Sequence, residues 1–374
     1  MSASLPRVSA SVAMPKGSLQ QVFDNLRAAG YTLVGPTVRD SAIVLDEIDG
    51  LDDLPQGWTD EQQPAHYRLK KAPDNQYFSY GVGPHSWKQF LHPSRLRLFS
   101  VEKNNGSWTI RPSQEPPPRY AFIGVRACDV AAIGIQDRVL IGSEFRDPHY
   151  AARREQVFVL AVNCSHSGAT CFCASMKTGP KVTGGFDLAL TELPDIFLVE
   201  IGSEAGAEVL GDVPWEAATA FDLGRASRVI QRAERQDGRH MLTDDLPDVL
   251  YENLESPQWD EVATRCLSCA NCTLVCPTCF CTTVEDVSNL RATSAERIRV
   301  ADSCFNRDFS HVHGGNSRPT IRSRYRQWLT HKLASWIDQF GTSGCVGCGR
   351  CITWCPVGIE ITEEVNAIRA KGGK

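Results

Sequence analysis

The most specific chemical pattern in the chain is a run of cysteines that occurs twice. Four cysteines spaced Cys-x2-Cys-x2-Cys-x3-Cys and followed by proline return in the same order 79 residues later. Thiolates in this spacing are the ligands of bacterial [4Fe–4S] clusters, so we expect the chain to carry two such clusters. The first copy comprises Cys266, Cys269, Cys272 and Cys276, and the second comprises Cys345, Cys348, Cys351 and Cys355.

The spacing also predicts which thiols share a cluster. Three thiols at i, i+3 and i+6 can wrap a short loop around three irons of one cube, but the fourth lies too far along the chain and ligates the other cube. Glycines between the ligands, such as Gly347 and Gly349, allow backbone N–H groups to approach the sulfurs. We therefore expect cluster 1 to be held by Cys266, Cys269, Cys272 and Cys355, and cluster 2 by Cys345, Cys348, Cys351 and Cys276.

Zinc is the alternative metal for a cysteine-rich segment. A structural zinc ion takes four ligands, usually from two separated CxxC or CxxH pairs. Two triplets, each followed by a Cys-Pro, fit that arrangement poorly. The pattern therefore favours iron–sulfur clusters over zinc.

Four further cysteines precede the two motifs. Two of them directly follow predicted buried strands over residues 120–125 and 157–162, and the ends of adjacent strands converge in space. We favour a third iron–sulfur cluster, while the alternative is that these residues are small buried hydrophobes. The four are Cys128, Cys164, Cys171 and Cys173.

Three cysteines fall outside these sets. Cys279, Cys281 and Cys304 cannot complete a standard site of four thiolates, so we expect reduced thiols packed beside a cluster. His311 and His313 lie near Cys304 in a glycine-rich loop, HVHGGN, and the loop accounts for them better than a metal site does.

The elements around the cysteines predict an α+β fold in two parts. A helix over residues 129–140 separates the strands at 120–125 and 157–162, which is a βαβ-like arrangement. From about residue 215 the pattern becomes mainly helical. We therefore expect a mixed α/β domain over residues 1–240, followed by an α-helical ferredoxin-type domain over residues 241–374 that holds the two [4Fe–4S] clusters.

A long amphipathic helix is predicted between the two cysteine motifs, over residues 318–340. Its apolar stripe includes Leu329, Leu333 and Trp336 and is expected to pack in a core. Basic residues occupy the other faces, where they are either solvated or serve to compensate cluster charge or to dock a partner. These residues are Arg322, Arg324, Arg326 and Lys332.

Composition and missing motifs exclude several classes of function. A formal net charge of −5 over 374 residues gives no reason to expect a nucleic acid partner. The odd number of cysteines, 15, favours metal ligands in a reducing compartment, and we expect the cytoplasm. No apolar run approaches the roughly 20 residues that span a bilayer, so no direct membrane insertion is expected. No GxGxxG or GxxxxGK[ST] nucleotide loop and no CxxCH haem motif can be identified.

The chain resembles, over most of its length, the β subunit of cytoplasmic sulfhydrogenases, the NAD(P)-linked [NiFe] hydrogenases. The A subunit of anaerobic sulfite reductase is similar. The resemblance is carried by GVRACDVAAI, NC…CFCASMKTGP, RCLSCANCTLVCPTCFC, DSCF and GCVGCGRCITWCPVGI, with DEQQPAHYRL and GPHSWKQFLHP in the N-terminal half. It implies an electron relay between a flavin- and NAD(P)-binding subunit and the small and large hydrogenase subunits, without catalysis by this chain alone.

Other functions stay open on the sequence. The same relay could serve a sulfite reductase or another reductase. A protein of a different class would be an oxidoreductase with its own substrate site in the N-terminal domain, and a flavin bound to the isolated chain would favour it. A regulatory or binding protein with structural, redox-silent clusters is a further alternative.

Overall fold

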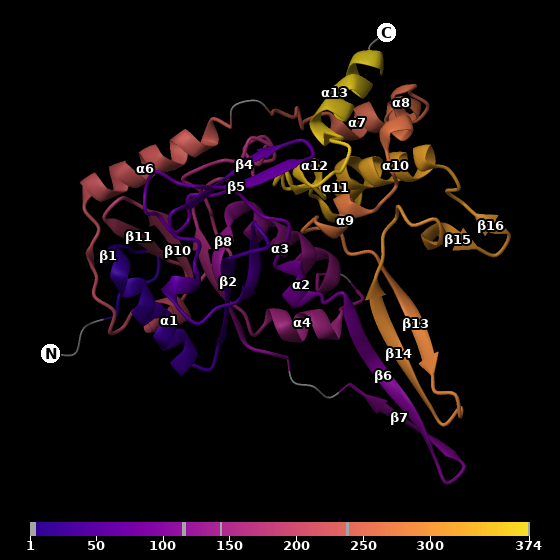
Figure 1. The fold of residues 1–374 in the computed structure, drawn as a ribbon, viewed down its shortest axis with the longest axis horizontal. Helices are drawn as coiled ribbons and strands as arrows, with labels where there is room; N and C mark the ends of the chain where they lie inside the picture. Colours follow the sequence, from indigo (N-terminus) through magenta and orange to yellow (C-terminus); the bar gives the residue numbers. More distant parts are fainter. Residues whose placement is uncertain (1–4, 114–116, 143, 237–238, 373–374) are drawn as a thin grey trace.

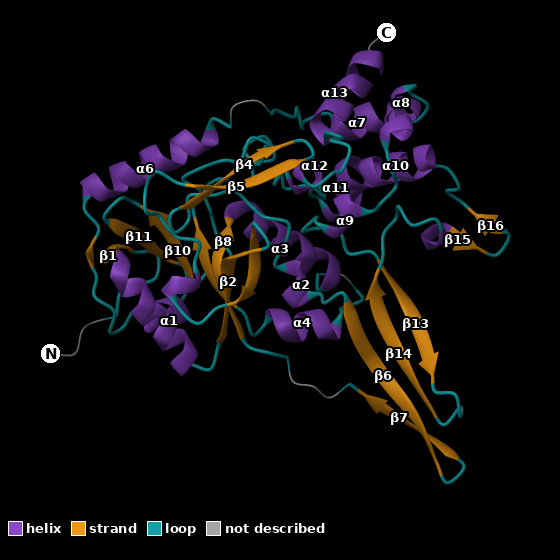
Figure 2. Cartoon of the chain, in the orientation of Figure 1, coloured by secondary structure: helices purple, strands orange, loops and turns teal. Residues whose placement is uncertain are grey.

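The computed structural model describes residues 5–113, 117–142, 144–236 and 239–372. A twisted sheet of eight strands forms the core of the N-terminal part (Figures 1 and 2). Three strand pairs are parallel, namely β2 with β8, β8 with β9, and β9 with β10. The other pairs in the sheet are antiparallel. In spatial order they are β12 (Glu216–Ala217), β1 (Ser11–Pro15), β11 (Ile196–Ile201), β10 (Leu188–Glu192), β9 (Phe158–Val162), β8 (Tyr120–Arg126), β2 (Thr32–Arg39) and β3 (Ala42–Glu47).

The central strands are buried on both faces because helices cover the sheet on both sides. Strand β9 is entirely buried, as is typical of a short apolar run in a parallel sheet. Its Leu160 contacts the core below α1 (Leu19–Ala28) and α5 (Glu204–Val209). Its Val159 and Ala161 face the opposite core. That second core is covered by α2 (Lys88–Leu91), α3 (Ala127–Leu140) and α4 (Pro148–Arg154).

The predicted strand–helix–strand unit is present as β8, α3 and β9. Strands β8 and β9 are adjacent and parallel, so their carboxyl ends lie at one edge of the sheet. Cys128 is in the first turn of α3, directly after β8, and Cys164 follows β9 by two residues. The fold therefore brings these two cysteines to the same edge, as the sequence predicted.

A second sheet of four antiparallel strands projects away from the rest of the molecule (Figure 1). Its order is β13 (Thr282–Ser288), β14 (Ser294–Ala301), β6 (Arg95–Asn104) and β7 (Ser107–Pro112). The prediction of mainly helical structure after residue 215 is wrong for this β13–β14 hairpin. Strand β13 is largely exposed and has no apolar face to reveal it as a strand. A division of the chain near residue 240 stays a prediction, but this sheet draws strands from both sides of that position.

The C-terminal part is a bundle of helices around a second core that contains Trp259, Tyr325, Leu333 and Val365. The predicted helix over residues 318–340 forms as α10 (Ile321–Thr330), a π-helical turn η4 (His331–Ser335) and α11 (Trp336–Phe340). The other helices here are α7 (Leu246–Glu252), α8 (Gln258–Arg265), α9 (Asn271–Leu274), α12 (Arg350–Thr353) and α13 (Ile361–Gly372).

Shorter elements complete the fold. Among the described residues, no helix has the length and apolar composition needed to cross a membrane.

Helix α6 packs against β11 and leads from the large sheet toward the helical part (Figure 1). The remaining elements are α6 (Ala220–Glu234), the hairpin β4 (Trp58–Gln63) and β5 (His66–Lys71), the hairpin β15 (His311–Val312) and β16 (Gly315–Asn316), and the 3₁₀ turns η1 (Lys16–Ser18), η2 (Leu51–Asp53) and η3 (Asp308–Ser310).

The two parts meet backbone to backbone at the cysteine loops. The N–H of Phe172 donates to the carbonyl of Gly347 at 2.8 Å. Gly347 has a φ of +62°, and a Cβ there would lie 2.6 Å from the backbone of Phe172. A Cβ on Gly349 would lie 2.5 Å from the carbonyl oxygen of Thr170. Both positions therefore require glycine, because the backbones of the two loops lie too close for a Cβ. This reason differs from the approach of N–H groups to sulfur that the sequence predicts.

Candidate iron–sulfur centres

The first cysteine loop begins where α8 ends. Cys266 caps that helix, and the following residues Ser268 and Ala270 have φ angles of +53° and +66°. These left-handed conformations turn the chain tightly enough to present several thiols to one side, and the N–H of Ser268 donates to Cys266 Sγ at 3.4 Å. The loop thus supplies both thiols and a backbone donor directed at a sulfur.

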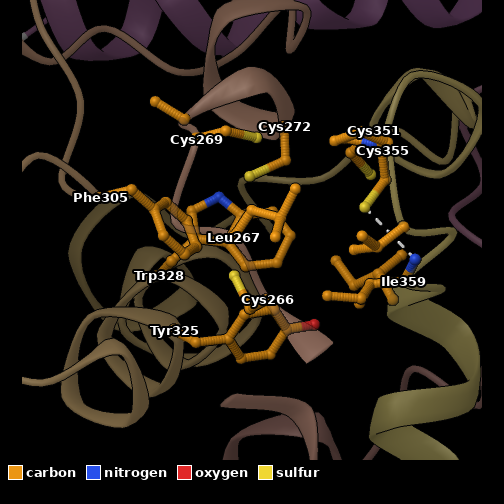
Figure 3. Close-up of a pocket in the computed structure, with 14 residues that line it drawn as sticks. Cys266, Leu267, Cys269, Cys272, Phe305, Tyr325, Trp328, Cys351, Cys355 and Ile359 are labelled. Carbon is orange, nitrogen blue, oxygen red and sulfur yellow. Dashed lines mark hydrogen bonds between the residues drawn. The ribbon is translucent and has the colours of Figure 1, made fainter. Parts of the chain in front are cut away.

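One cavity is lined by the three thiols of the first loop and by two from the second, Cys351 and Cys355 (Figure 3). Cys355 reaches this cavity from the far end of the second motif, and its Sγ accepts a hydrogen bond from the N–H of Ile359 at 3.3 Å. Cys276, the fourth cysteine of the first motif, does not line it. The thiols that line this cavity are Cys266, Cys269, Cys272, Cys351 and Cys355. The charge of Cys355 raises the pKa of both Cys266 and Cys272, which links it to the first triplet.

Apolar side chains enclose the same cavity. Phe305, Tyr325, Trp328 and Ile359 form its walls (Figure 3). Burial in this setting raises the pKa of Cys272 well above its usual range, since a thiolate is poorly solvated there. A metal that replaces the thiol proton removes this cost, so the donor set fits an iron–sulfur cluster.

A second group of thiols lies around Cys276. The charges of Cys345, Cys348 and Cys276 all act on Cys351, whose pKa is raised well above its usual range mainly by burial. The N–H of Gly347 donates to Cys345 Sγ at 3.4 Å, as expected for a glycine between ligands. The structure therefore groups Cys276 with the second triplet. The charge of Cys272, from the first cysteine group, also raises the pKa of Cys351, so the first and second groups are neighbours.

Lys332 places a buried positive charge beside Cys276. Its ammonium donates to Cys276 Sγ at 3.3 Å, to Thr278 Oγ1 at 3.1 Å and to the carbonyl of Gly344 at 2.9 Å. A hydrogen bond from the Cys279 thiol, together with Lys332, holds the pKa of Cys276 well below its usual range despite burial. Lys332 belongs to the π-helical turn η4, an irregularity that often marks functional positions in helices.

The basic residues of the long helix thus have different roles. Lys332 is only 5% exposed and compensates charge at a cysteine group. Arg324 is also buried and donates to the carbonyls of Arg318 and Pro319. Arg322 and Arg326 pair with Glu255 on the surface. The sequence left solvation and charge compensation open, and the structure assigns both, to different residues.

The four N-terminal cysteines also lie together. The charge of Cys173 raises the pKa of Cys128 and of Cys171, and the charge of Cys164 raises the pKa of Cys171 and of Cys173. Burial is the main cause of each of these shifts. Gln236 donates to Cys173 Sγ at 2.9 Å.

A buried arginine faces this N-terminal group. Burial raises the pKa of Cys164, and the positive charge of Arg126 partly offsets this rise. The Nη2 of Arg126 donates to the carbonyls of Phe78 and Tyr80. Its Nη1 is buried and has no hydrogen-bond partner among the described residues. An unpartnered buried N–H beside four thiols is suited to an anionic group, which an iron–sulfur cluster with four thiolates is.

The N-terminal group borders the second group. Cys128, Cys173 and Cys348 belong to one buried cluster of side chains. Arg350 forms a bidentate ion pair with Asp129, with N–O distances of 2.8 and 3.1 Å. This pair could not be predicted from the sequence, because its members are 221 residues apart.

The remaining candidates are placed as follows. Cys279 donates to Cys276, Cys304 lies near Cys272, and Cys281 contacts Cys304. That these thiols lie beside a bound cluster stays a prediction. His311 and His313 are exposed on and beside the short β15–β16 hairpin. No set of three or more Cys, His, Asp or Glu within the described residues is arranged to hold a single metal ion. The thiols of a cube are held further apart by its four irons.

Comparison with known proteins gives two matches. Residues 265–359 match the 4Fe-4S dicluster domain family. The whole chain is similar to sulfhydrogenase 2 subunit beta of Pyrococcus furiosus, with 30% identity over 356 residues, which cover 93% of this chain and 95% of that protein. No solved structure matches significantly.

Replacing Lys332 should change the electrostatics of the second group. In Lys332→Met the side-chain volume is kept and the charge is lost, which removes about 1–4 kcal/mol of attraction for negative charge near Cys276. We expect the reduction potential of the adjacent cluster to become more negative, measured by redox titration with electron paramagnetic resonance (EPR). Arg326→Gln, on the exposed side of the same helix, is the matched control. Equal potentials in Lys332→Met and wild type would contradict the role of Lys332.

Proposed function

We propose a specific relay for this chain, which belongs to the sulfhydrogenase beta subunit family and is an iron–sulfur electron-transfer subunit. In this proposal it carries electrons between a flavin- and NAD(P)-binding subunit and a [NiFe] hydrogenase. The hydrogenase small and large subunits are its proposed partners at the other end of the relay. The cytoplasm is the proposed compartment, because an odd number of cysteines, most of them in the proposed cluster-ligand sets, fits a reducing environment.

The observation that supports the relay most is the exchange of fourth cysteines between the two motifs. Cys355 lines the cavity of the first triplet, and Cys276 lies with the second. This exchange is the arrangement of two-cluster ferredoxins, whose clusters lie close enough to pass electrons. We propose that cluster 1 is held by Cys266, Cys269, Cys272 and Cys355, and cluster 2 by Cys345, Cys348, Cys351 and Cys276.

We also propose a third cluster in the N-terminal group. Its support is the convergence of four thiols, two of them buried and two half-buried, and the buried, unpartnered Nη1 of Arg126 beside them. The contact of Cys128 and Cys173 with Cys348 would place this cluster next to cluster 2. The proposed ligands are Cys128, Cys164, Cys171 and Cys173.

The chain's own residues prepare these sites for one-electron transfer. Apolar walls cover much of the cluster 1 site, although Cys269 is exposed. Lys332 offsets charge at cluster 2, and Arg126 does so at the N-terminal group. The bound clusters would supply one-electron steps, which suit a flavin that accepts a hydride as an electron pair and releases electrons singly. The three groups adjoin in a row, so electrons could cross the chain without a nucleotide site of its own.

The exchange of fourth ligands can be tested by matching spectra. Cys276→Ser should damage the same cluster as Cys345→Ser, and Cys355→Ser the same cluster as Cys266→Ser, because each pair shares one cube. The measurement is EPR of the reduced, anaerobically purified variants. Cys269→Ser and Cys348→Ser serve as second members of each class. A Cys276→Ser spectrum that matches Cys266→Ser would refute the assignment.

The third cluster can be tested by iron counting in the full chain. Wild type should contain about twelve irons and as many sulfides, and the double variant Cys164→Ser/Cys171→Ser about eight. Far-ultraviolet circular dichroism checks that the variant is folded. His311→Ala/His313→Ala is the matched control and should keep all the iron. About eight irons in wild type would show that the N-terminal cysteines are structural.

The relay itself can be tested by deletion from the complex. The isolated chain should oxidise neither hydrogen nor NAD(P)H, because neither a nucleotide motif nor a nickel motif is found in its sequence. A complex without the chain should keep each half-reaction with artificial dyes and lose the coupled reaction. Coupled turnover that survives deletion would exclude the relay, and coupling to sulfite in place of hydrogen would identify a reductase complex.

A further inference from the structure

The β13–β14 hairpin brings two cysteines together that none of the three cysteine groups uses. Cys281 directly precedes β13, and Cys304 follows β14 by three residues. The two strands pair from Thr282 opposite Ala301, and the N–H of Asp302 donates to the carbonyl of Cys281 at 2.9 Å. The base of the hairpin therefore fixes the two thiols as neighbours although they are 23 residues apart in sequence.

The two thiols are hydrogen-bonded to each other. Both the side chain and the backbone N–H of Cys304 donate to Cys281 Sγ, and the side-chain hydrogen bond is the main cause that lowers the pKa of Cys281 to about 7. A thiol with a pKa near ambient pH combines a high thiolate fraction with good nucleophilicity. Cys304, the donor of these hydrogen bonds, is the second thiol of the pair.

Cys281 faces a cavity of about 220 Å³ between the hairpin base and α2. Polar side chains line much of it, including Lys88, Ser94 and Asp302. Cys279 also lines the cavity, but its thiol donates to Cys276, a proposed ligand of cluster 2. Cys281 is therefore the nucleophilic thiol of this cavity.

Cys304 lies on the other side of the pair, toward the first cysteine group. Cys304 lies within range of the charge of Cys272, and both residues pack against the helical core. The pair thus extends from a cavity at Cys281 to a proposed ligand of cluster 1. A thiol pair in this position can meet a molecule on one side and a one-electron carrier on the other.

We propose that Cys281 and Cys304 form a redox-active dithiol that reduces small disulfides entering this cavity. The cavity is smaller than the roughly 300–1,000 Å³ of sites for drug-sized ligands, so the substrate is a low-molecular-weight disulfide and not a folded protein.

The exchange balances with the chain's own thiols. The Cys281 thiolate attacks one sulfur of the substrate, which forms a mixed disulfide and releases the first thiolate product. Cys304 loses its proton and attacks Cys281 Sγ, which releases the second thiolate and closes the Cys281–Cys304 disulfide. The substrate is reduced by two electrons and the thiol pair is oxidised by two. The two products take up the two protons that the pair gives up.

Renewal of the dithiol rests on the proposed function. Two electrons and two protons reopen the disulfide, and the reduced iron–sulfur centres are the proposed electron source. The exchange half of the reaction needs no centre, so it can be tested apart from the relay.

The first experiment maps the thiols of the full-length, anaerobically purified chain after treatment with bis(2-hydroxyethyl) disulfide. Peptide mass spectrometry without reductant should find a Cys281–Cys304 disulfide and two released thiols per chain. Cys304→Ser should keep the mixed disulfide on Cys281, and Cys281→Ser should form neither product. Cys279→Ser, the matched control in the same cavity, should still form the internal disulfide. Modification of Cys279 in place of Cys281, or an unmodified pair, would overturn the proposal.

The second experiment follows the electrons. Addition of the same disulfide to the reduced chain should abolish the cluster EPR signal in wild type and leave it in Cys281→Ser. Both chains should hold the same iron, because Cys281 is not a ligand in this proposal. Loss of iron in Cys281→Ser, or signal loss equal to wild type, would overturn it. Failure of coupled hydrogen–NAD(P) turnover with intact disulfide exchange would count against the relay alone.

Discussion

The ion pair between Arg350 and Asp129 joins the two parts of the molecule at the cysteine groups. Both side chains are almost completely buried, at 2% and 3% exposed, and Arg350 also donates to the carbonyl of Gly83. Removal of one partner would leave an uncompensated charge in a dry interior, which costs about 3–5 kcal/mol in comparable cases. Asp129 adjoins Cys128 in sequence and Arg350 adjoins Cys351, so this pair fixes how two cysteine groups face each other.

Charge compensation follows the same pattern at two of the three cysteine groups. Burial raises the cost of a thiolate there, and buried cations replace part of the lost solvation. Lys332 has this position beside Cys276, and Arg126 beside Cys164. The cations are held by backbone carbonyls as well, such as Gly344 for Lys332, so their positions depend on the fold and not on the cysteines alone.

The sequence predicts the ligand chemistry of this protein better than the tertiary contacts around the ligands. The ligand spacing in each motif is local, and β8, α3 and β9 follow from local periodicity, so these features could be read without coordinates. Contacts between distant residues could not. Lys332 and Arg326 are both basic residues of one helical segment, and only tertiary packing buries the first while it leaves the second partly exposed. The β13–β14 hairpin was missed because it lacks a buried face of its own.

The close approach of Phe172 and Gly347 has a consequence for biogenesis. Once these loops touch, Cys128 and Cys348 are 6% and 8% exposed, and a carrier protein that delivers iron and sulfide has no access to them. With Cys128 and Cys348 as ligands, as proposed above, iron and sulfide would have to enter while the loops are apart. On that assignment, cofactor delivery precedes the final docking of the two parts.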